Sequence, residues 1–187
     1  FESDAEVVVC PREGAKTVVV SLGLWLPLAV EDLLFASMGY SAVHVPGLQM
    51  KFRRDPLWVL ENRESIGRDM VDACRRTHAS WMVFTGCSGQ GLGALSFGAR
   101  AQADAILVFS PISSLDPRAL DALRDMRSQG SILAPVLGAT ERVAEADALQ
   151  DLIEHPVETT VVYDPVHPFD APHAERLGTA PNVTLEI

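Results

Sequence analysis

The hydrophobic residues of this chain form short apolar runs, separated by longer stretches with helical spacing. Some runs are continuous, such as Val18–Val20 and Ile106–Phe109, which is typical of strands covered on both faces. We predict strands at Glu6–Cys10, Thr17–Leu22, Ser41–Val45, Trp81–Thr85, Ala105–Ser110, Thr159–Tyr163 and Val183–Ile187. We predict helices at Leu28–Met38, Ser65–Thr77, Gly91–Ala101, Pro117–Ser128, Arg142–Glu154 and Ala171–Leu177.

Strands and helices alternate along the chain. This order predicts a three-layer α/β sandwich with a mostly parallel central sheet and helices on both faces, because parallel neighbours are joined by crossover helices. The connection Pro11–Lys16 between the first two strands is the only one short enough for a β-hairpin. A chain of 187 residues without internal repeats suits one domain, which we expect to span residues 1–187.

Composition narrows the class of partner. A formal net charge of −10 opposes nucleic-acid binding, which needs basic groups to displace counterions, and it opposes docking on anionic membranes. The most apolar stretch, Thr17–Val30, is too short for a membrane helix and contains Pro27. Three scattered cysteines, Cys10, Cys74 and Cys87, indicate neither a disulfide framework nor a zinc site. We therefore expect a cytoplasmic protein that acts on a small molecule, with no cofactor and no metal.

The glycine-rich segment Thr85–Ala94 follows a predicted strand and opens a predicted helix, at the edge of the sheet where chemistry usually lies in α/β proteins. One interpretation is a nucleophile elbow, in which a serine on a sharp strand-turn-helix junction needs small residues two positions before and after it. Gly86 meets this need for Ser88, whereas Gln90 adds bulk on the other side. The N–H of Gly89 would then begin the helix, ready to stabilise an oxyanion.

The residues alone leave other interpretations of this segment open. Cys87 also suits the nucleophile position, because Thr85 and Gly89 are then its small neighbours and the helix N-terminus would favour a thiolate. The glycines can also serve only close packing of the helix on the sheet. A dinucleotide site is rejected because no acidic residue ends the next predicted strand, and a P-loop is rejected because no Lys-Ser/Thr pair follows.

The elbow segment resembles that of a known family. Gly-Cys-Ser-Gly-Gln-Gly-Leu-Gly-Ala-Leu at Gly86–Leu95 is similar, without a gap, to the Gly-Ser-Ser-Met-Gly-Gly-Tyr-Gly-Ala-Leu segment of a bacterial branch of the α/β-hydrolase superfamily. The likeness extends to Phe97-Gly98, Ala105–Pro111, Leu115–Pro117, Asp170–Leu177 and Pro181–Leu185. The resemblance therefore covers most of the chain.

The resemblance implies a serine hydrolase framework with Ser88 as the nucleophile. It also implies an acid after the strand Thr159–Tyr163 and a histidine after the strand Val183–Ile187. A triad needs that imidazole to accept the serine proton. Because the sequence begins at Phe1 and ends at Ile187, we expect it to be a piece of a longer chain whose catalytic histidine lies beyond Ile187.

Two aspartates are candidates for the acid of the triad. Asp164 and Asp170 both lie after the sixth predicted strand, where the acid belongs. Each also has a structural interpretation, since Asp164 precedes a proline in a turn and Asp170 suits a helix N-cap. His167 and His173 share this loop but lack the ligand spacing of a metal site, so we interpret both as surface histidines.

A second oxyanion donor is expected after the second predicted strand, at Gly23, Leu24 or Trp25, beside the N–H of Gly89. The leading hypothesis is a domain that cleaves an ester or thioester, or transfers an acyl group, through Ser88. The alternative hypothesis is a catalytically inactive α/β-hydrolase-like domain that binds a ligand or a protein in the same crevice.

Overall fold

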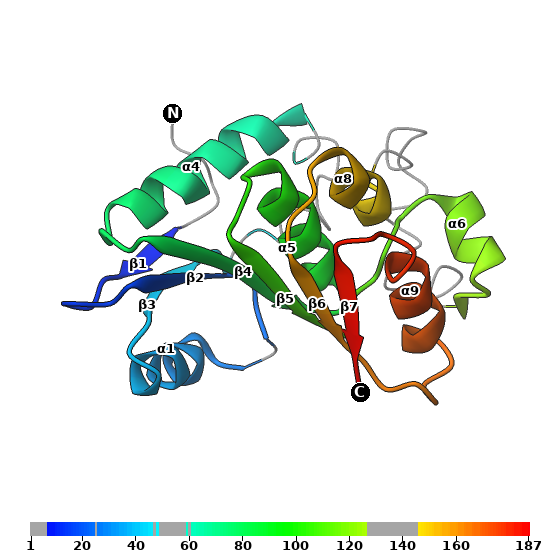
Figure 1. The fold of residues 1–187 in the computed structure, drawn as a ribbon, viewed down its shortest axis with the longest axis horizontal. Coiled ribbons are helices and arrows are strands. Elements are labelled where there is room, and N and C mark those ends of the chain that lie inside the picture. Colours follow the sequence, from blue (N-terminus) through cyan, green and yellow to red (C-terminus); the bar gives the residue numbers. More distant parts are fainter. Residues whose placement is uncertain (1–6, 25, 47, 49–58, 60, 127–145) are drawn as a thin grey trace.

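The computed structural model describes residues 7–24, 26–46, 48, 59, 61–126 and 146–187. In these parts of the chain, seven strands form one sheet in the order β1-β3-β2-β4-β5-β6-β7 (Figure 1). The strands are β1 (Val8–Cys10), β2 (Thr17–Ser21), β3 (Ser41–His44), β4 (Trp81–Cys87), β5 (Ala105–Phe109), β6 (Thr159–Val162) and β7 (Val183–Glu186). The strands predicted from the hydrophobic pattern are therefore confirmed, with their ends shifted by one or two residues.

The predicted hairpin between β1 and β2 is wrong. β1 instead pairs antiparallel with β3, with Val9 opposite Val43, and β3 lies parallel to β2. The crossover from β2 through α1 (Leu28–Ser37) leads to β3, which pairs with the edge of β2 that β1 would need to form a hairpin. β1 is therefore added on the outer edge of β3, and the remaining described strand pairs are parallel.

Helices cover both faces of the sheet, as the alternating pattern predicts. Figure 1 shows α1 on one face and α4, α5 and α8 on the other. The described helices are α1 (Leu28–Ser37), α4 (Arg63–Arg75), α5 (Gly89–Arg100), α6 (Pro117–Ala122), α8 (Ala148–Glu154) and α9 (Asp170–Leu177). Two predicted helices, Pro117–Ser128 and Arg142–Glu154, run partly into residues 127–145, which lie outside the described residues.

The helix that follows β4 packs closely against the sheet. A Cβ atom at Gly98 of α5 would lie 2.9 Å from Cγ1 of Ile106 and 3.0 Å from Cβ of Phe84, so a glycine is needed at this contact. Leu95 on the same helix and Phe84 beneath it are fully buried. This close approach holds the first turn of α5 at the end of β4.

The parallel strands end at one edge of the sheet, and their registers align. Ser21 of β2 pairs with Thr85 of β4, and Cys87 of β4 pairs with Phe109 of β5. The segments that follow these strands therefore lie next to one another, at the edge where ligands bind in α/β sheets. The candidate site residues lie on the segments that follow β2, β4 and β6.

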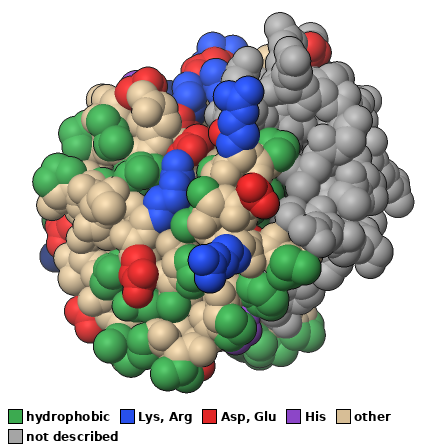
Figure 2. Space-filling model, turned by 90° about the vertical axis from the view of Figure 1, so that its right-hand side faces the viewer, with side chains coloured by type: hydrophobic (Ala, Val, Ile, Leu, Met, Phe, Trp, Pro, Cys, Tyr) green, Lys and Arg blue, Asp and Glu red, His purple; other side chains and the backbone are tan. Residues whose placement is uncertain are grey.

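In the described residues, no helix is both long enough and apolar enough to cross a bilayer. Figure 2 shows the molecule from the side on which α6, α9 and β7 lie in Figure 1. On the described part of this side, Lys and Arg side chains lie among Asp and Glu side chains rather than in one continuous patch. Charges of both signs are therefore interspersed here, as on an ordinary solvated surface.

Replacing Leu95 by alanine is expected to lower the free energy of unfolding by about 2–5 kcal/mol, because it leaves a cavity between α5 and the sheet. Leu33→Ala is the matched control, since Leu33 on α1 is 69% exposed, and it should change stability by less than about 0.5 kcal/mol. Urea unfolding followed by circular dichroism measures both. Equal losses for the two variants would contradict the packing described here.

Candidate active site

Ser88 is the N-cap of α5 and has backbone angles of φ 55° and ψ −120°. A residue with a side chain rarely adopts this region, and doing so costs on the order of 1–3 kcal/mol. Two hydrogen bonds hold the conformation: the N–H of Ser88 donates to the carbonyl of Phe109 (3.0 Å), and the N–H of Ile112 donates to the carbonyl of Ser88 (3.1 Å). Strain of this kind at a strand-helix junction is typical of a nucleophile elbow.

The close contact within this turn falls on Gly86. A Cβ atom there would lie 2.5 Å from the backbone oxygen of Gln90, a distance that nothing but glycine tolerates. The side chain of Gln90 does not fill the turn, contrary to the sequence-based expectation. It lies beside Gly23, whose own added Cβ would be 3.5 Å from Gln90 Cγ. The position two residues after Ser88 therefore accepts a long side chain, because the tight contact involves backbone atoms only.

Cys87, the alternative nucleophile, is half-buried at the end of β4. Burial raises the pKa of its thiol, and the nearby negative charge of Asp170 raises that pKa further. The protonated thiol is therefore favoured, whereas a nucleophilic cysteine needs a lowered pKa. The unusual backbone conformation belongs to Ser88 and not to Cys87.

The loop after β6 separates the two candidate acids. The side chain of Asp164 accepts a hydrogen bond from the N–H of Val166 (3.0 Å) and is exposed, as expected for a turn residue. Asp170 is the first residue of α9, and its negative charge acts on the thiol of Cys87 next to Ser88. Of the two carboxylates, Asp170 is the one whose charge contributes to the raised pKa of Cys87.

His167 lies three residues before Asp170, and its Nδ1 is 3.2 Å from the carboxylate of Asp170. The backbone N–H of Asp170 donates to the same Nδ1. The imidazole is partly exposed, at 43% of its side-chain surface. His167 therefore orients the start of α9, and no hydrogen bond joins it to Ser88 among the described residues.

His173 is fully buried, so its interpretation as a surface histidine is wrong. Its Nδ1 accepts from the N–H of Ser113 (3.0 Å) and contacts the hydroxyl of Ser113 (2.8 Å). The proton therefore belongs on Nε2, which faces the carboxylate of Asp125 at 2.9 Å. The apolar spacing of α9 could have indicated that one face of this helix is buried. It could not have indicated that Ser113 and Asp125 are the partners of His173.

The loop after β2 contains Gly23 and Leu24, two of the residues predicted to donate to an oxyanion. The carbonyl of Gly23 accepts a hydrogen bond from the N–H of Cys87 (3.0 Å), so this loop lies directly beside the elbow. The N–H of Leu24, however, donates to a carboxylate oxygen of Glu31 (2.6 Å). Trp25 lies outside the described residues. The structure therefore brings the loop to Ser88 but leaves the Leu24 donor engaged by Glu31.

Glu31 is a site residue that sequence reasoning missed. It lies in the first turn of α1, is 3% exposed, and also accepts from the hydroxyl of Ser21 (2.7 Å). Burial alone would raise its pKa, but the facing imidazole of His44, the N–H of Leu24 and the Ser21 hydroxyl outweigh it, so the pKa is lowered. A buried carboxylate therefore holds the loop beside Ser88. The only sequence signal was a pair of adjacent acidic residues, Glu31 and Asp32, in a mostly apolar helix.

A cavity of about 170 Å³ lies behind this loop. Its wall includes Gly23, Glu31, His44 and Gln90, so it lies between the loop after β2, the first turn of α5 and the end of β3. The polar groups in this wall offer hydrogen-bond partners to a small group that enters next to the elbow.

No family model matches the chain, and no curated protein matches it. Solved structures do. A carboxylesterase from Lactobacillus plantarum is similar over 97% of this chain and 76% of its own, with 10% identity and a TM-score of 0.68. A metagenome-derived lipolytic enzyme is similar over 98% of this chain and 85% of its own, with 14% identity and a TM-score of 0.59.

An α/β-hydrolase enzyme from the sediment metagenome of the Mar Chica lagoon in Morocco is similar over 96% of this chain and 82% of its own. The identity is 16% and the TM-score 0.61. These likenesses concern the fold, a mostly parallel seven-stranded sheet with flanking helices. The expected α/β-hydrolase-like fold class is thereby confirmed.

Gly86→Ala is expected to lower the free energy of unfolding by about 1–3 kcal/mol or more, because the added methyl group meets a backbone oxygen that cannot move aside. Gly89→Ala is the matched control in the same turn. A Cβ atom there has nothing within 4 Å, so the change should stay within about 0.5 kcal/mol. Thermal unfolding of both variants checks the geometry of the elbow, which would be wrong if Gly89→Ala were the more damaging change.

Glu31→Gln is expected to destabilise the protein by about 1–3 kcal/mol at neutral pH, since an amide cannot accept from both the Leu24 N–H and the Ser21 hydroxyl through two oxygens. Because the folded-state pKa of Glu31 is lowered, its ionisation stabilises the fold above the ordinary value of 4.5, and this contribution is lost as pH falls through the lowered pKa. The difference between wild type and variant should therefore shrink in acid.

Urea unfolding at several pH values measures this difference. Glu13→Gln is the control, because Glu13 is exposed and its substitution should leave stability unchanged at every pH. A wild-type-to-variant difference that stayed constant from neutral to acid pH would show that the charge of Glu31 does not stabilise the fold.

Proposed function

We propose that this protein hydrolyses an ester or thioester, or transfers an acyl group, with Ser88 as the nucleophile. The observation that carries the proposal is the strained backbone of Ser88 between β4 and α5. In a nucleophile elbow such a backbone points the hydroxyl away from the turn, which here would be at the edge of the sheet where the loops after β2, β4 and β6 meet. The esterases and lipolytic enzymes with a similar fold support the same class of reaction.

In the proposed reaction, Oγ of Ser88 attacks the carbonyl carbon of the substrate, and its proton passes to a base. The carbonyl oxygen becomes an oxyanion beside the N–H of Gly89, at the start of α5. Collapse of the tetrahedral intermediate expels the alcohol or thiol, which takes the proton, and leaves an acyl group on Ser88. Water or another acceptor then removes the acyl group by the same steps.

Asp170 is the acid in this proposal, because its charge acts next to the elbow while the Asp164 carboxylate is used within its own turn. Its role is to orient an imidazole, and β7 ends beside β6 at the same edge. A segment following β7 would therefore enter the site next to Asp170, which is where the sequence leads us to expect the histidine.

A binding domain without hydrolase activity is the second candidate. Two observations favour it: the N–H of Leu24 is engaged by Glu31, and among the described residues no histidine ring hydrogen-bonds to the hydroxyl of Ser88. In such a domain, the cavity beside Gly23 and Gln90 would receive a ligand group that is not transformed. The two candidates share the crevice and differ in the reactivity of Ser88.

A fluorophosphonate probe on the full-length natural protein separates the two candidates. Attack by Ser88 forms an oxygen–phosphorus bond and releases fluoride, with the serine proton passing to the base. We expect stoichiometric labelling of the wild type, none of Ser88→Ala, and unchanged labelling of Cys87→Ala. A folded wild-type protein that remains unlabelled would favour the binding domain.

Two matched variants, Asp170→Asn and Asp164→Asn, test which aspartate is the acid of the proposed triad. Asp170→Asn should slow labelling and ester hydrolysis on the order of 10⁴-fold, the loss seen when the orienting acid of a triad is neutralised. Asp164→Asn should leave the rate unchanged, because that carboxylate is exposed and bonded within its own turn. Reversed effects of the two substitutions would assign the acid to Asp164.

A further inference from the structure

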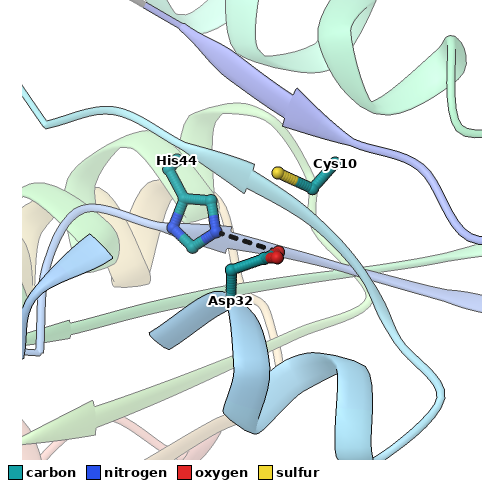
Figure 3. A group of neighbouring side chains, drawn as sticks. All are labelled: Cys10, Asp32 and His44. Atoms are coloured by element: carbon teal, nitrogen blue, oxygen red, sulfur yellow. Dashed lines mark ion pairs between the residues drawn. The ribbon is translucent and has the colours of Figure 1, made fainter. Parts of the chain in front are cut away.

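Three side chains from different elements meet on the face of the sheet that α1 covers. They are Cys10 at the end of β1, Asp32 on α1 and His44 at the end of β3, and Figure 3 shows them pointing toward one another. The sulfur, a carboxylate oxygen and a ring nitrogen all lie within 4.8 Å of one another. None of these residues takes part in the proposed chemistry of Ser88.

His44 is the unusual member of this group. It is 1% exposed, and both of its ring nitrogens are buried without a hydrogen-bond partner. Its Nε2 lies 3.7 Å from Oδ1 of Asp32, and its Nδ1 lies 3.6 Å from Oε2 of Glu31, both too far for hydrogen bonds. A buried imidazole normally forms at least one hydrogen bond, whereas His44 forms none and its Nε2 faces the aspartate at ion-pair distance only.

We propose that Cys10, Asp32 and His44 bind a divalent transition-metal ion, with Zn²⁺ the best match. Thiolate, imidazole and carboxylate are the three ligand types of zinc sites, and thiolate together with imidazole disfavours Mg²⁺ and Ca²⁺. In a tetrahedral zinc site, such ligand atoms lie about 3.3–3.6 Å apart, as follows from metal–ligand bonds of about 2.0–2.3 Å. The 3.7 Å between His44 and Asp32 is already close to this spacing.

The surroundings of the group fit a metal ligand set. A histidine that binds a metal usually presents its second nitrogen to a carboxylate, and Glu31 faces Nδ1 of His44 on the side away from Asp32. Arg12 donates to Oδ1 of Asp32 (2.8 Å) and to its backbone carbonyl (3.2 Å), which anchors the carboxylate beside His44 and Cys10. The charges of a divalent ion and Arg12 would balance those of the Cys10 thiolate, Asp32 and Glu31.

Binding requires one proton to leave. Burial and the carboxylate of Asp32 raise the pKa of the Cys10 thiol, so the metal-free group carries a proton. On binding, a sulfur–metal bond forms and the thiol proton passes to solvent. The ion would then join β1, α1 and β3, and through Glu31 it would also stabilise the loop that contacts Cys87 beside Ser88.

The test uses Co²⁺ alone, added to the full-length protein after removal of metals under reducing conditions. We expect one Co²⁺ per chain, with a sulfur-to-cobalt charge-transfer band in the near ultraviolet that Zn²⁺ bleaches by displacement. The band should be absent from Cys10→Ser. In Asp32→Asn, the affinity for Co²⁺ should fall at least about tenfold, because one ligand contact is lost. Cys74→Ser should keep the band, because Cys74 is buried in α4, away from the site.

Folding of each variant is checked by circular dichroism before the titration, and Cys10→Ser changes one atom on a half-buried edge strand. The proposal is overturned if the folded wild type shows no charge-transfer band, or if Cys10→Ser shows a band as strong as the wild type. Loss of the band in Cys74→Ser alone would likewise overturn it. Because labelling of Ser88 by the fluorophosphonate probe does not depend on Co²⁺, the two proposals succeed or fail separately.

Discussion

The backbone of Ser88 is held in an unfavourable conformation by hydrogen bonds to the segment that leaves β5, and the arrangement of the site depends on this constraint. Phe109 and Ile112 provide the two bonds, while Gly86 supplies the space that the turn requires. The strain persists because α5 is fixed on the sheet by the close contact at Gly98. The packing of the core therefore maintains the strained backbone of Ser88 at the edge of the sheet.

Two carboxylates lie on opposite sides of this elbow and serve different purposes. Asp170 reaches it from the segment after β6 and acts on the thiol of Cys87. Glu31 reaches it from α1, holds the N–H of Leu24, and faces His44 on its other side. The same buried carboxylate therefore connects the loop beside Ser88 with the proposed metal ligands around His44.

Much of the candidate site followed from local sequence pattern. The glycines and Ser88 after a continuous apolar strand predicted the turn, and in the structure the small size of Gly86 is what the turn requires. The same reasoning failed for Gln90, because it assumed that the side chain rather than the backbone oxygen makes the tight contact. It also failed for His173, whose partners Ser113 and Asp125 lie 60 and 48 residues away in the chain.

The sequence by itself determined the order of strands and helices, the fold class and the position of the strained turn, because apolar periodicity and glycine placement act over a few residues. Only the tertiary structure decided that β1 pairs with β3, that the charge of Asp170 raises the pKa of Cys87, and that Cys10, Asp32 and His44 meet. Each of these depends on which distant segments the crossover connections bring together, and no spacing along the chain encodes it.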